Sequence, residues 1–151
     1  MQKYLKKSLI ILLLLSVTAL KSESFHDKNY NTNLQIINNK NSHIGNFKVK
    51  IVREERDREI GLMFVNSLPV NYGMLFEFEK EQVIHMWMKN TKISLDMIFI
   101  DKNNRIIDIK HKTVPESLQI ISSVKEAIKV LEINGGLCHK LGIKIGDFIK
   151  Y

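Results

Sequence analysis

Six polar and charged residues could form one pocket that binds an anion or a sugar. They are Arg58, Lys89, Asn90, Thr91, Asp96 and Glu132. A hairpin between the apolar segments 83–88 and 95–100 would bring Lys89 close to Asp96, at a sheet end where sites are often found. Two cations, two carboxylates and an amide there would bind a carboxylate, phosphate or sugar through charge-assisted hydrogen bonds. The alternative is an ion-pair network that only holds the hairpin and a helix together.

A catalytic version of this pocket needs a proton carrier that works near neutral pH. The candidates are His85, Asp96 and His111, and an envelope enzyme would use Asp96 or His85 as its general acid or base. The sequence contains no Gly-x-Ser-x-Gly elbow and no His-Glu-x-x-His motif. Cys138 precedes His139, but adjacency in sequence does not orient a base toward a thiol. No catalytic residue is predicted, and the enzyme stays an alternative.

Methionines provide a second alternative, a Cu(I) site in an exported protein. Thioether and imidazole groups suit Cu(I), and the candidates are His85, Met86 and Met88. In a strand, the two thioethers would lie on one face. Methionine is also a common core residue, and Met63, Met74 and Met88 have apolar neighbours. Core packing is the favoured interpretation, and no metal or cofactor is predicted.

Short apolar segments position these side chains. Phe47, Val49 and Ile51 alternate with Lys48 and Lys50, which predicts a half-buried strand. Further strands are expected at residues 74–78, 83–88, 95–100, 105–109 and 127–133. Turn residues separate these segments, so the spacing favours antiparallel pairing.

Two short helices complete the predicted elements. Ile60, Met63 and Phe64 have helical spacing behind a charged stretch, so their apolar face would cover one end of the sheet. A one-turn helix is expected at residues 137–141, and a final hairpin near residues 146–147. This pattern is typical of a mainly β fold: an antiparallel β-sandwich or barrel-like domain with one or two short helices.

The N-terminus predicts export from a bacterial cell. Residues 1–24 combine a basic start, an apolar run of about 13 residues and small residues at Ser22 and Ser24, which are the parts of a secretory signal. The run is shorter than the ~20 residues that span a bilayer, so membrane attachment would need an uncleaved signal. Residues 25–45 are predicted to be a flexible polar leader, and residues 46–151 a single β-rich domain. The expected location is the periplasm or the exterior.

Charge and cysteine content narrow the classes of function. The formal charge of +7 falls to +4 without residues 1–24, which carry four lysines and one glutamate. There is no arginine-rich run, so nucleic-acid binding is not predicted. Cys138 is the only cysteine, and we expect it to be buried as a small core residue.

Several segments, in order, resemble one known family. Residues 58–64 read Arg-Glu-Ile-Gly-Leu-Met-Phe, residues 73–76 read Gly-Met-Leu-Phe, and residues 87–91 read Trp-Met-Lys-Asn-Thr. Together with residues 95–101, 130–132, 136 and 146–147, they make residues 47–151 similar to the bacterial and archaeal family called domain of unknown function 192. The resemblance implies a compact β-sandwich or barrel-like fold, often behind a signal sequence, and no established activity.

The predicted function is that of an exported cell-envelope domain. It is interpreted as a non-enzymatic small-ligand-binding or accessory module that uses the polar pocket at a sheet end. Its partner would be a small ligand or an envelope protein, and not a nucleic acid.

Overall fold

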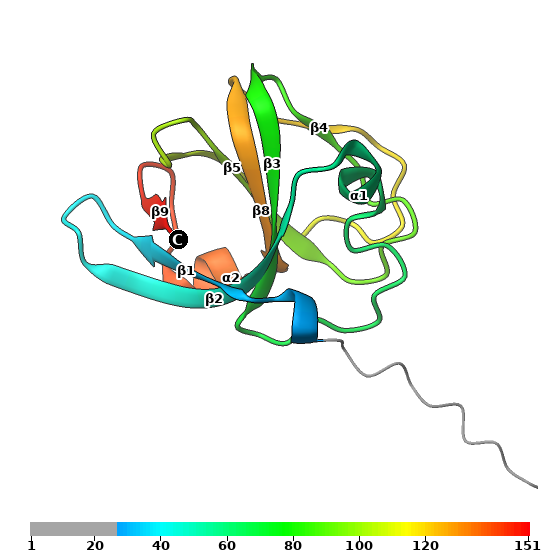
Figure 1. Ribbon diagram of the computed structural model, residues 1–151, viewed down its shortest axis with the longest axis horizontal. Helices are drawn as coiled ribbons and strands as arrows, with labels where there is room; N and C mark the ends of the chain where they lie inside the picture. Colours follow the sequence, from blue (N-terminus) through cyan, green and yellow to red (C-terminus); the bar gives the residue numbers. More distant parts are fainter. Residues whose placement is uncertain (1–26) are drawn as a thin grey trace, which may run out of the picture.

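Alternating apolar residues form a seven-stranded sheet in the computed structural model, which describes residues 27–151 (Figure 1). The strand order is β6-β5-β8-β3-β2-β1-β9, and β4 pairs with β7 in a separate small sheet. The strands are β1 (Thr32–Ile37), β2 (His43–Val52), β3 (Tyr72–Gln82), β4 (His85–Met86), β5 (Leu95–Ile100), β6 (Ile106–Lys110), β7 (Ile121–Ser122), β8 (Ala127–Asn134) and β9 (Phe148–Lys150). The helical segments are η1 (Asp27–Asn29), α1 (Glu55–Ile60) and α2 (Leu137–Leu141). The predicted mainly β fold with two short α-helices is confirmed.

The large sheet curls into a half-barrel whose two edges approach each other. A bridge joins Arg105 to Phe148, and the backbone N–H of Ile149 donates to the carbonyl of Asn104 at 3.0 Å. All ladders are antiparallel except that between β2 and β3, which is parallel. This pair departs from the antiparallel prediction because the segment that contains α1 returns the chain to the end where β2 began.

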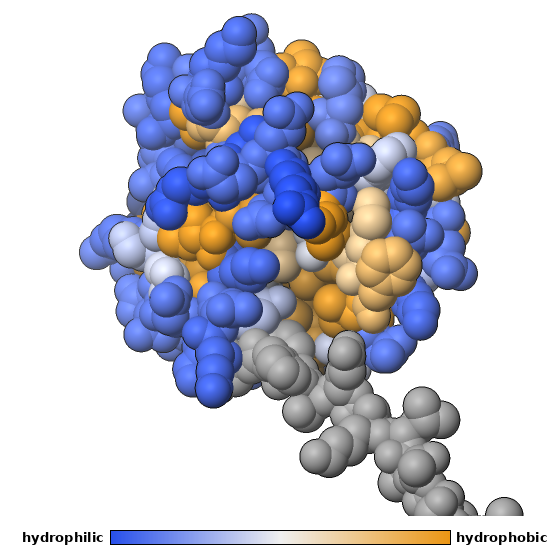
Figure 2. Space-filling view, turned by 45° about the vertical axis from the view of Figure 1, so that its right-hand side comes forward, coloured by the Kyte–Doolittle hydropathy of each residue, from blue (hydrophilic) through white to orange (hydrophobic). Residues whose placement is uncertain are grey.

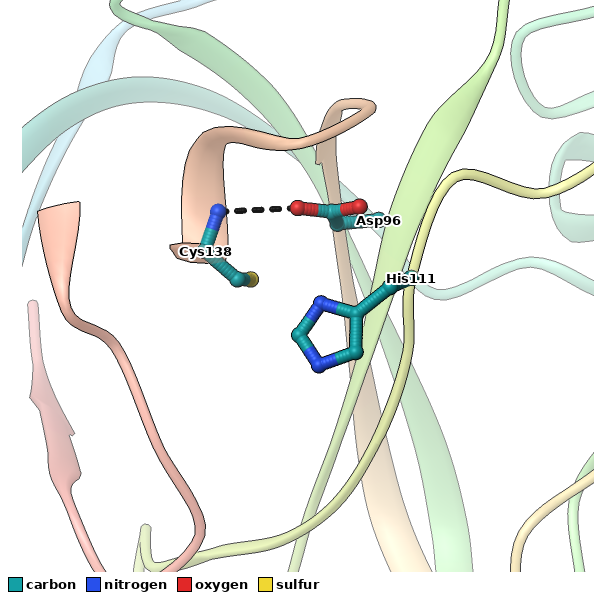
Figure 3. A group of neighbouring side chains, drawn as sticks. All are labelled: Asp96, His111 and Cys138. Carbon is teal, nitrogen blue, oxygen red and sulfur yellow. Dashed lines mark hydrogen bonds between the residues drawn. The ribbon is translucent and has the colours of Figure 1, made fainter. Parts of the chain in front are cut away.

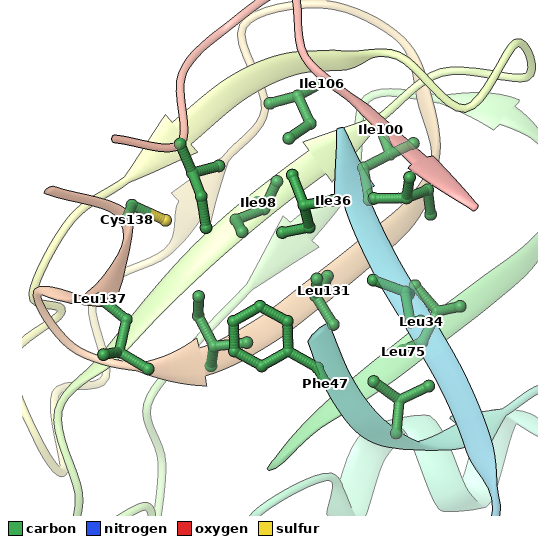
Figure 4. Close-up of a cluster of buried hydrophobic side chains, with 14 residues drawn as sticks. Leu34, Ile36, Phe47, Leu75, Ile98, Ile100, Ile106, Leu131, Leu137 and Cys138 are labelled. Atoms are coloured by element: carbon green, nitrogen blue, oxygen red, sulfur yellow. The ribbon is translucent and has the colours of Figure 1, made fainter. Parts of the chain in front are cut away.

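Both faces of the large sheet are buried at its centre, along β5, β8 and the first half of β3, whereas β1 and β2 expose one face. The six residues of β5 are all buried, although successive side chains on a strand point to opposite faces. Figure 4 shows the inner cluster, where Phe47, Leu75, Ile98 and Leu131 pack inside the curl. The outer cluster contains Met74, Phe76, Met97, Phe99 and Val130 from the sheet, covered by Leu62, Leu68, Ile84 and Met88 from the segments around α1 and β4.

The domain begins earlier than the sequence predicted. Within the expected flexible leader, residues 25–45, the structure places β1 between β2 and β9. Leu34 and Ile36 are fully buried, so even a short apolar patch among asparagines and lysines completes the sheet. The predicted signal, residues 1–24, lies outside the described residues.

The first helix also differs from its prediction. It consists of the charged stretch itself and contains no buried residue, so the expected apolar face through Ile60, Met63 and Phe64 is wrong. The helix ends at Gly61, whose φ of +49° favours glycine, and a Cβ there would lie 3.2 Å from the Phe76 ring. The second helix and the burial of Cys138 are as predicted. Within residues 27–151, no helix is both long and apolar enough to cross a membrane.

Candidate functional site

A pocket lies between α1, the connection from β4 to β5, and the outer face of the sheet. Its lining includes four of the six predicted site residues: Arg58, Lys89, Thr91 and Glu132. Arg58 comes from α1, Lys89 and Thr91 from the connection, and Glu132 from β8. The pocket has an enclosed volume of about 20 Å³. That is room for about one water-sized group, such as one oxygen of a carboxylate or phosphate, so the rest of a ligand must lie outside the pocket.

Glu132 forms the buried floor of this pocket. It lies between β3 and β5, paired with Met74 and Met97, and only 4% of its surface is exposed. Burial raises the pKa of the Glu132 carboxyl from 4.5 to about 8, because a weakly polar environment disfavours the charged form. The carboxyl is therefore predominantly neutral at pH 7.

The Glu132 carboxyl has no hydrogen bond or ion pair within the described part of the chain. The ion pairs there are Arg53–Glu77, Lys102–Glu81 and Lys110–Asp108. No described side-chain nitrogen or oxygen is both sealed from solvent and without a hydrogen bond. The oxygens of Glu132 must therefore reach the accessible space of the pocket. A buried acid in this situation is typical of functional sites.

Arg58 fastens α1 to the sheet and retains unused donors. Its Nη1 donates to the backbone carbonyls of Arg53 and Glu77, the second at 3.1 Å. Its guanidinium carbon lies 4.8 Å from the centre of the Phe78 ring. Because a guanidinium has five N–H groups, Nε and Nη2 keep donors for a ligand.

Lys89 lies over the aromatic face of Trp87 at the rim of the pocket. Its Nζ is 4.8 Å from the ring centroid, and no carboxylate within residues 27–151 pairs with it. Thr91 holds this segment in place, because its N–H donates to Met88 at 3.0 Å and its hydroxyl to the Lys89 carbonyl at 3.2 Å. The rim thus presents an ammonium group on a firmly held connection.

Asn90 supports the wall and does not line the pocket. Its backbone has a φ of +54°, and its carbonyl accepts the N–H of Phe64 at 2.9 Å. Its Nδ2 donates to the sulfur of Met63, a lining residue, at 3.8 Å. Asn90 therefore acts on the pocket through its neighbours.

Asp96 lies on the opposite face of the sheet from Glu132. Met97 is the register partner of Glu132 and shares its face, so Asp96, one residue earlier, faces the inner core. The prediction that Asp96 joins the pocket is wrong for this reason. The expected hairpin is wrong as well, because β4 pairs with β7 and does not bring Lys89 to Asp96.

Asp96 instead binds three backbone N–H groups. Its Oδ1 accepts from Lys112 and Gly136, each at 2.8 Å. Its Oδ2 accepts from Cys138 at 2.8 Å, the hydrogen bond drawn in Figure 3. Burial raises the pKa of this carboxyl, but the three donors outweigh burial and hold the pKa below its ordinary value. An ionised Asp96 therefore ties the β6–β7 loop and the start of α2 to β5.

His111 and Cys138 lie beside Asp96, and one ligand atom of each residue lies within 4.8 Å of the others. Burial, reinforced by the charge of Asp96, raises the pKa of the Cys138 thiol far above its ordinary value. A protonated thiol is a weak nucleophile and a poor metal ligand. Since both oxygens of Asp96 already accept hydrogen bonds, this group is part of the architecture.

The three Cu(I) candidates are not brought together. Met88 is fully buried, and its sulfur accepts a hydrogen bond from the Thr113 hydroxyl at 3.1 Å. His85 is exposed and bonded to the Ser122 hydroxyl at 2.7 Å, whereas Met86 lines the pocket. Consecutive strand residues point to opposite sides, which separates His85 from Met86. His85 is therefore not placed to carry protons in the pocket.

Six lining residues were not predicted as site residues from the sequence: Glu59, Gly61, Leu62, Met63, Phe76 and Trp87. They lie in the segments 58–64, 73–76 and 87–91 that carry the family resemblance, so their positions in the sequence contained a signal. Tyr30 lies near Glu132 without lining the pocket, and the sequence gave no signal for it because it precedes β1 in an asparagine-rich stretch. Burial, followed by the nearby Glu132, raises the pKa of Tyr30 to about 12.

Residues 35–151 match the sequence profile of DUF192, described as "Uncharacterized ACR". The chain belongs to the DUF192 family. A solved structure from Sinorhizobium meliloti 1021, described as a candidate transcription regulator, is 34% identical with a TM-score of 0.75 and covers 78% of this chain and 91% of its own. A solved structure of a protein of unknown function from Novosphingobium aromaticivorans DSM 12444 is 31% identical, with a TM-score of 0.75. The match covers 80% of this chain and 84% of that one. No curated protein matches this DUF192 sequence.

Replacing Asp96 should destabilise this DUF192 domain. Asp96→Asn should lower the free energy of unfolding by about 3 kcal/mol at pH 7, because the amide has one acceptor oxygen and turns an NH₂ group toward a backbone donor. Urea unfolding measures the loss. Asp101→Asn is the matched control, since Asp101 accepts two backbone N–H groups at 2.9 Å in an exposed turn. Its loss should be about 1 kcal/mol.

The pH dependence of this effect has a definite sign. Because folding lowers the pKa of Asp96, its stabilisation is complete above the ordinary value of 3.8 and is lost as the pH falls through the lower folded-state value. The difference in the free energy of unfolding between wild type and Asp96→Asn should therefore become smaller in acid. The anchoring role of Asp96 would be contradicted if Asp96→Asn and Asp101→Asn lost equal stability at pH 7, or if this difference stayed constant in acid.

Proposed function

We propose that the chain is an exported, non-enzymatic cell-envelope domain that binds a small ligand with an anionic oxygen over Glu132. The observation that carries the proposal is a buried carboxyl that faces an open pocket and has no hydrogen-bond partner among residues 27–151. Arg58 and Lys89 line the same pocket and supply unused cationic donors. Charge-assisted hydrogen bonds from such donors favour a carboxylate or a phosphate.

Binding is favoured over catalysis by the positions of the proton carriers. Both oxygens of Asp96 accept backbone hydrogen bonds on the other face, and His85 bonds to Ser122 outside the lining. A general base must be within reach of its substrate. The pocket therefore suits recognition, either of a small ligand or of an anionic group on an envelope protein.

Export is supported by the order of segments along the chain. The basic start and apolar run end by Ser24, whereas the first strand begins at Thr32. Removal of residues 1–24 would leave every strand of the described sheet intact. Cys138 is buried and makes no disulfide within residues 27–151, which suits an oxidising compartment.

Ligand binding should depend on Lys89. Thermal unfolding with inorganic phosphate, small carboxylates and neutral sugars should reveal an anion that raises the midpoint of the wild type, because a native-state ligand stabilises the fold. Lys89→Ala should weaken its binding by tenfold or more, as expected for the loss of a charge-assisted hydrogen bond of about 1.5–3 kcal/mol.

Lys92→Ala is the matched control for charge. Lys92 is exposed three residues away, bonds to Asn66 at 3.1 Å and does not line the pocket. It should respond to the anion as the wild type does. The same midpoint shift in all three proteins would mean that the anion binds elsewhere, and the absence of any shift would remove the binding proposal.

Export should be lost when a charge enters the apolar run. In a bacterial host, cell fractionation and intact mass should find the wild type outside the cytoplasm and shortened near residue 24. Leu13→Arg should remain inside at full length, whereas Asn39→Arg, with the same charge change in an exposed loop, should be exported. A full-length cytoplasmic wild type, or normal export of Leu13→Arg, would contradict the proposal.

A further inference from the structure

Exposed apolar side chains border the pocket over Glu132. Ile60, Phe64, Leu118 and Ile120 are 45%, 64%, 68% and 57% exposed, and we call these four residues the apolar collar. Figure 2 brings the α1 and β4 side of the molecule forward and shows apolar side chains gathered there among hydrophilic ones. Grouped apolar side chains on a surface often mark a contact site.

One side of the collar is held by backbone geometry. Ile60 and Phe64 flank the lining residues Gly61 and Met63 along the chain. Phe64 has a φ of +64°, which is uncommon for a bulky residue, and its N–H donates to Asn90 at 2.9 Å. Such strained positions cluster at ligand-contact sites. The Phe64 ring is thus kept at the surface rather than packed into the core.

The other side of the collar comes from the segment that leads into β7. Ile120 directly precedes Ile121, which pairs with the lining residue Met86. Leu118 follows Ser117, whose carbonyl accepts the N–H of Met88 at 3.1 Å. The collar therefore flanks the opening from two elements.

We propose that the ligand is a small carboxylic acid with an apolar chain, whose ionised carboxylate accepts a hydrogen bond from the protonated Glu132 carboxyl and whose chain lies on the apolar collar. This deepens the proposed function and rests on it. The pocket admits only an end group, so the remainder of a ligand must lie outside, where the collar offers an apolar surface. Arg58 and Lys89 balance the carboxylate charge at the rim.

Binding should depend on pH, because the Glu132 carboxyl can donate a hydrogen bond to the ligand only while it is protonated. The charged residues that line the pocket with Glu132 are Arg58 and Glu59 from α1 and Lys89 from the β4–β5 connection, and Tyr30 from the segment before β1 interacts electrostatically with Glu132. On the outer face, β3 and β5 contribute Met74, Phe76 and Met97 around Glu132, and Tyr72 of β3 packs against Tyr30. Tyr30, with its pKa near 12, stays neutral below pH 10. Glu132 is therefore the group whose titration changes binding between pH 6.5 and 9.5.

The proposal is tested by titrating the protein with hexanoate, acetate and hexylammonium between pH 6.5 and 9.5. Binding is followed by the NMR amide signals of residues 87–91. Hexanoate stays ionised throughout, so its dissociation constant for the wild type should rise about tenfold per pH unit above about 8, as Glu132 loses its proton. Acetate should bind at least tenfold more weakly, because it lacks the apolar chain.

Three variants separate the contributions. Glu132→Gln donates an N–H at every pH, so its affinity for hexanoate should not change with pH. Lys89→Met should bind about tenfold more weakly and keep the pH slope. Phe64→Asn, which tolerates the positive φ, should weaken hexanoate and leave acetate unchanged.

The outcomes distinguish this inference from the proposed function. Tighter binding of hexylammonium than of hexanoate, or a pH slope retained by Glu132→Gln, would overturn the role of Glu132. If inorganic phosphate or acetate bound as tightly as hexanoate, the proposed contact of an apolar chain with the collar would be wrong, but anion binding would stand. If no anion bound, both this inference and the proposed function would be wrong.

Discussion

Burial of both faces at the centre of one curled sheet is the constraint on which the rest of the structure depends. The inner face is closed by the curl and α2, but the outer face needs a second layer, which α1, its following loop and the β4–β7 sheet provide. That layer is made of short segments, and it leaves a gap above β8. The pocket is this gap, and Glu132 is the outward-facing residue of β8 that occupies its floor.

The carboxyl groups of Asp96 and Glu132, on the neighbouring strands β5 and β8, have pKa values shifted in opposite directions because of this arrangement. Asp96 faces the inner core, where three backbone donors stabilise its charge and where it fixes the loops at one end of the sheet. Glu132 faces the outer layer, where nothing in the described chain compensates its loss of hydration. An uncompensated buried acid lowers stability, so a compensating ligand is the physical reason for proposing a site there.

The fold class and part of the site could be predicted from the sequence. The span of β5 was predicted to the residue, because five apolar residues and Asp96 stand between turn residues. β1 could not be found, since Leu34 and Ile36 acquire their role only by pairing with distant strands. Residue types identified Arg58, Lys89, Thr91 and Glu132, but only the register shows which face each side chain occupies. A one-residue offset was enough to misplace Asp96.

The central claim is that Glu132 faces the pocket as a neutral acid, and its own titration tests this most directly. Carboxyl ¹³C signals of the ligand-free protein, with Glu132 assigned by comparison with Glu132→Gln, would be followed from pH 3 to pH 10. The account predicts a midpoint near 8 for Glu132. A midpoint near the ordinary value of 4.5 would mean that water or a protein partner already stabilises the charge, and it would contradict the account.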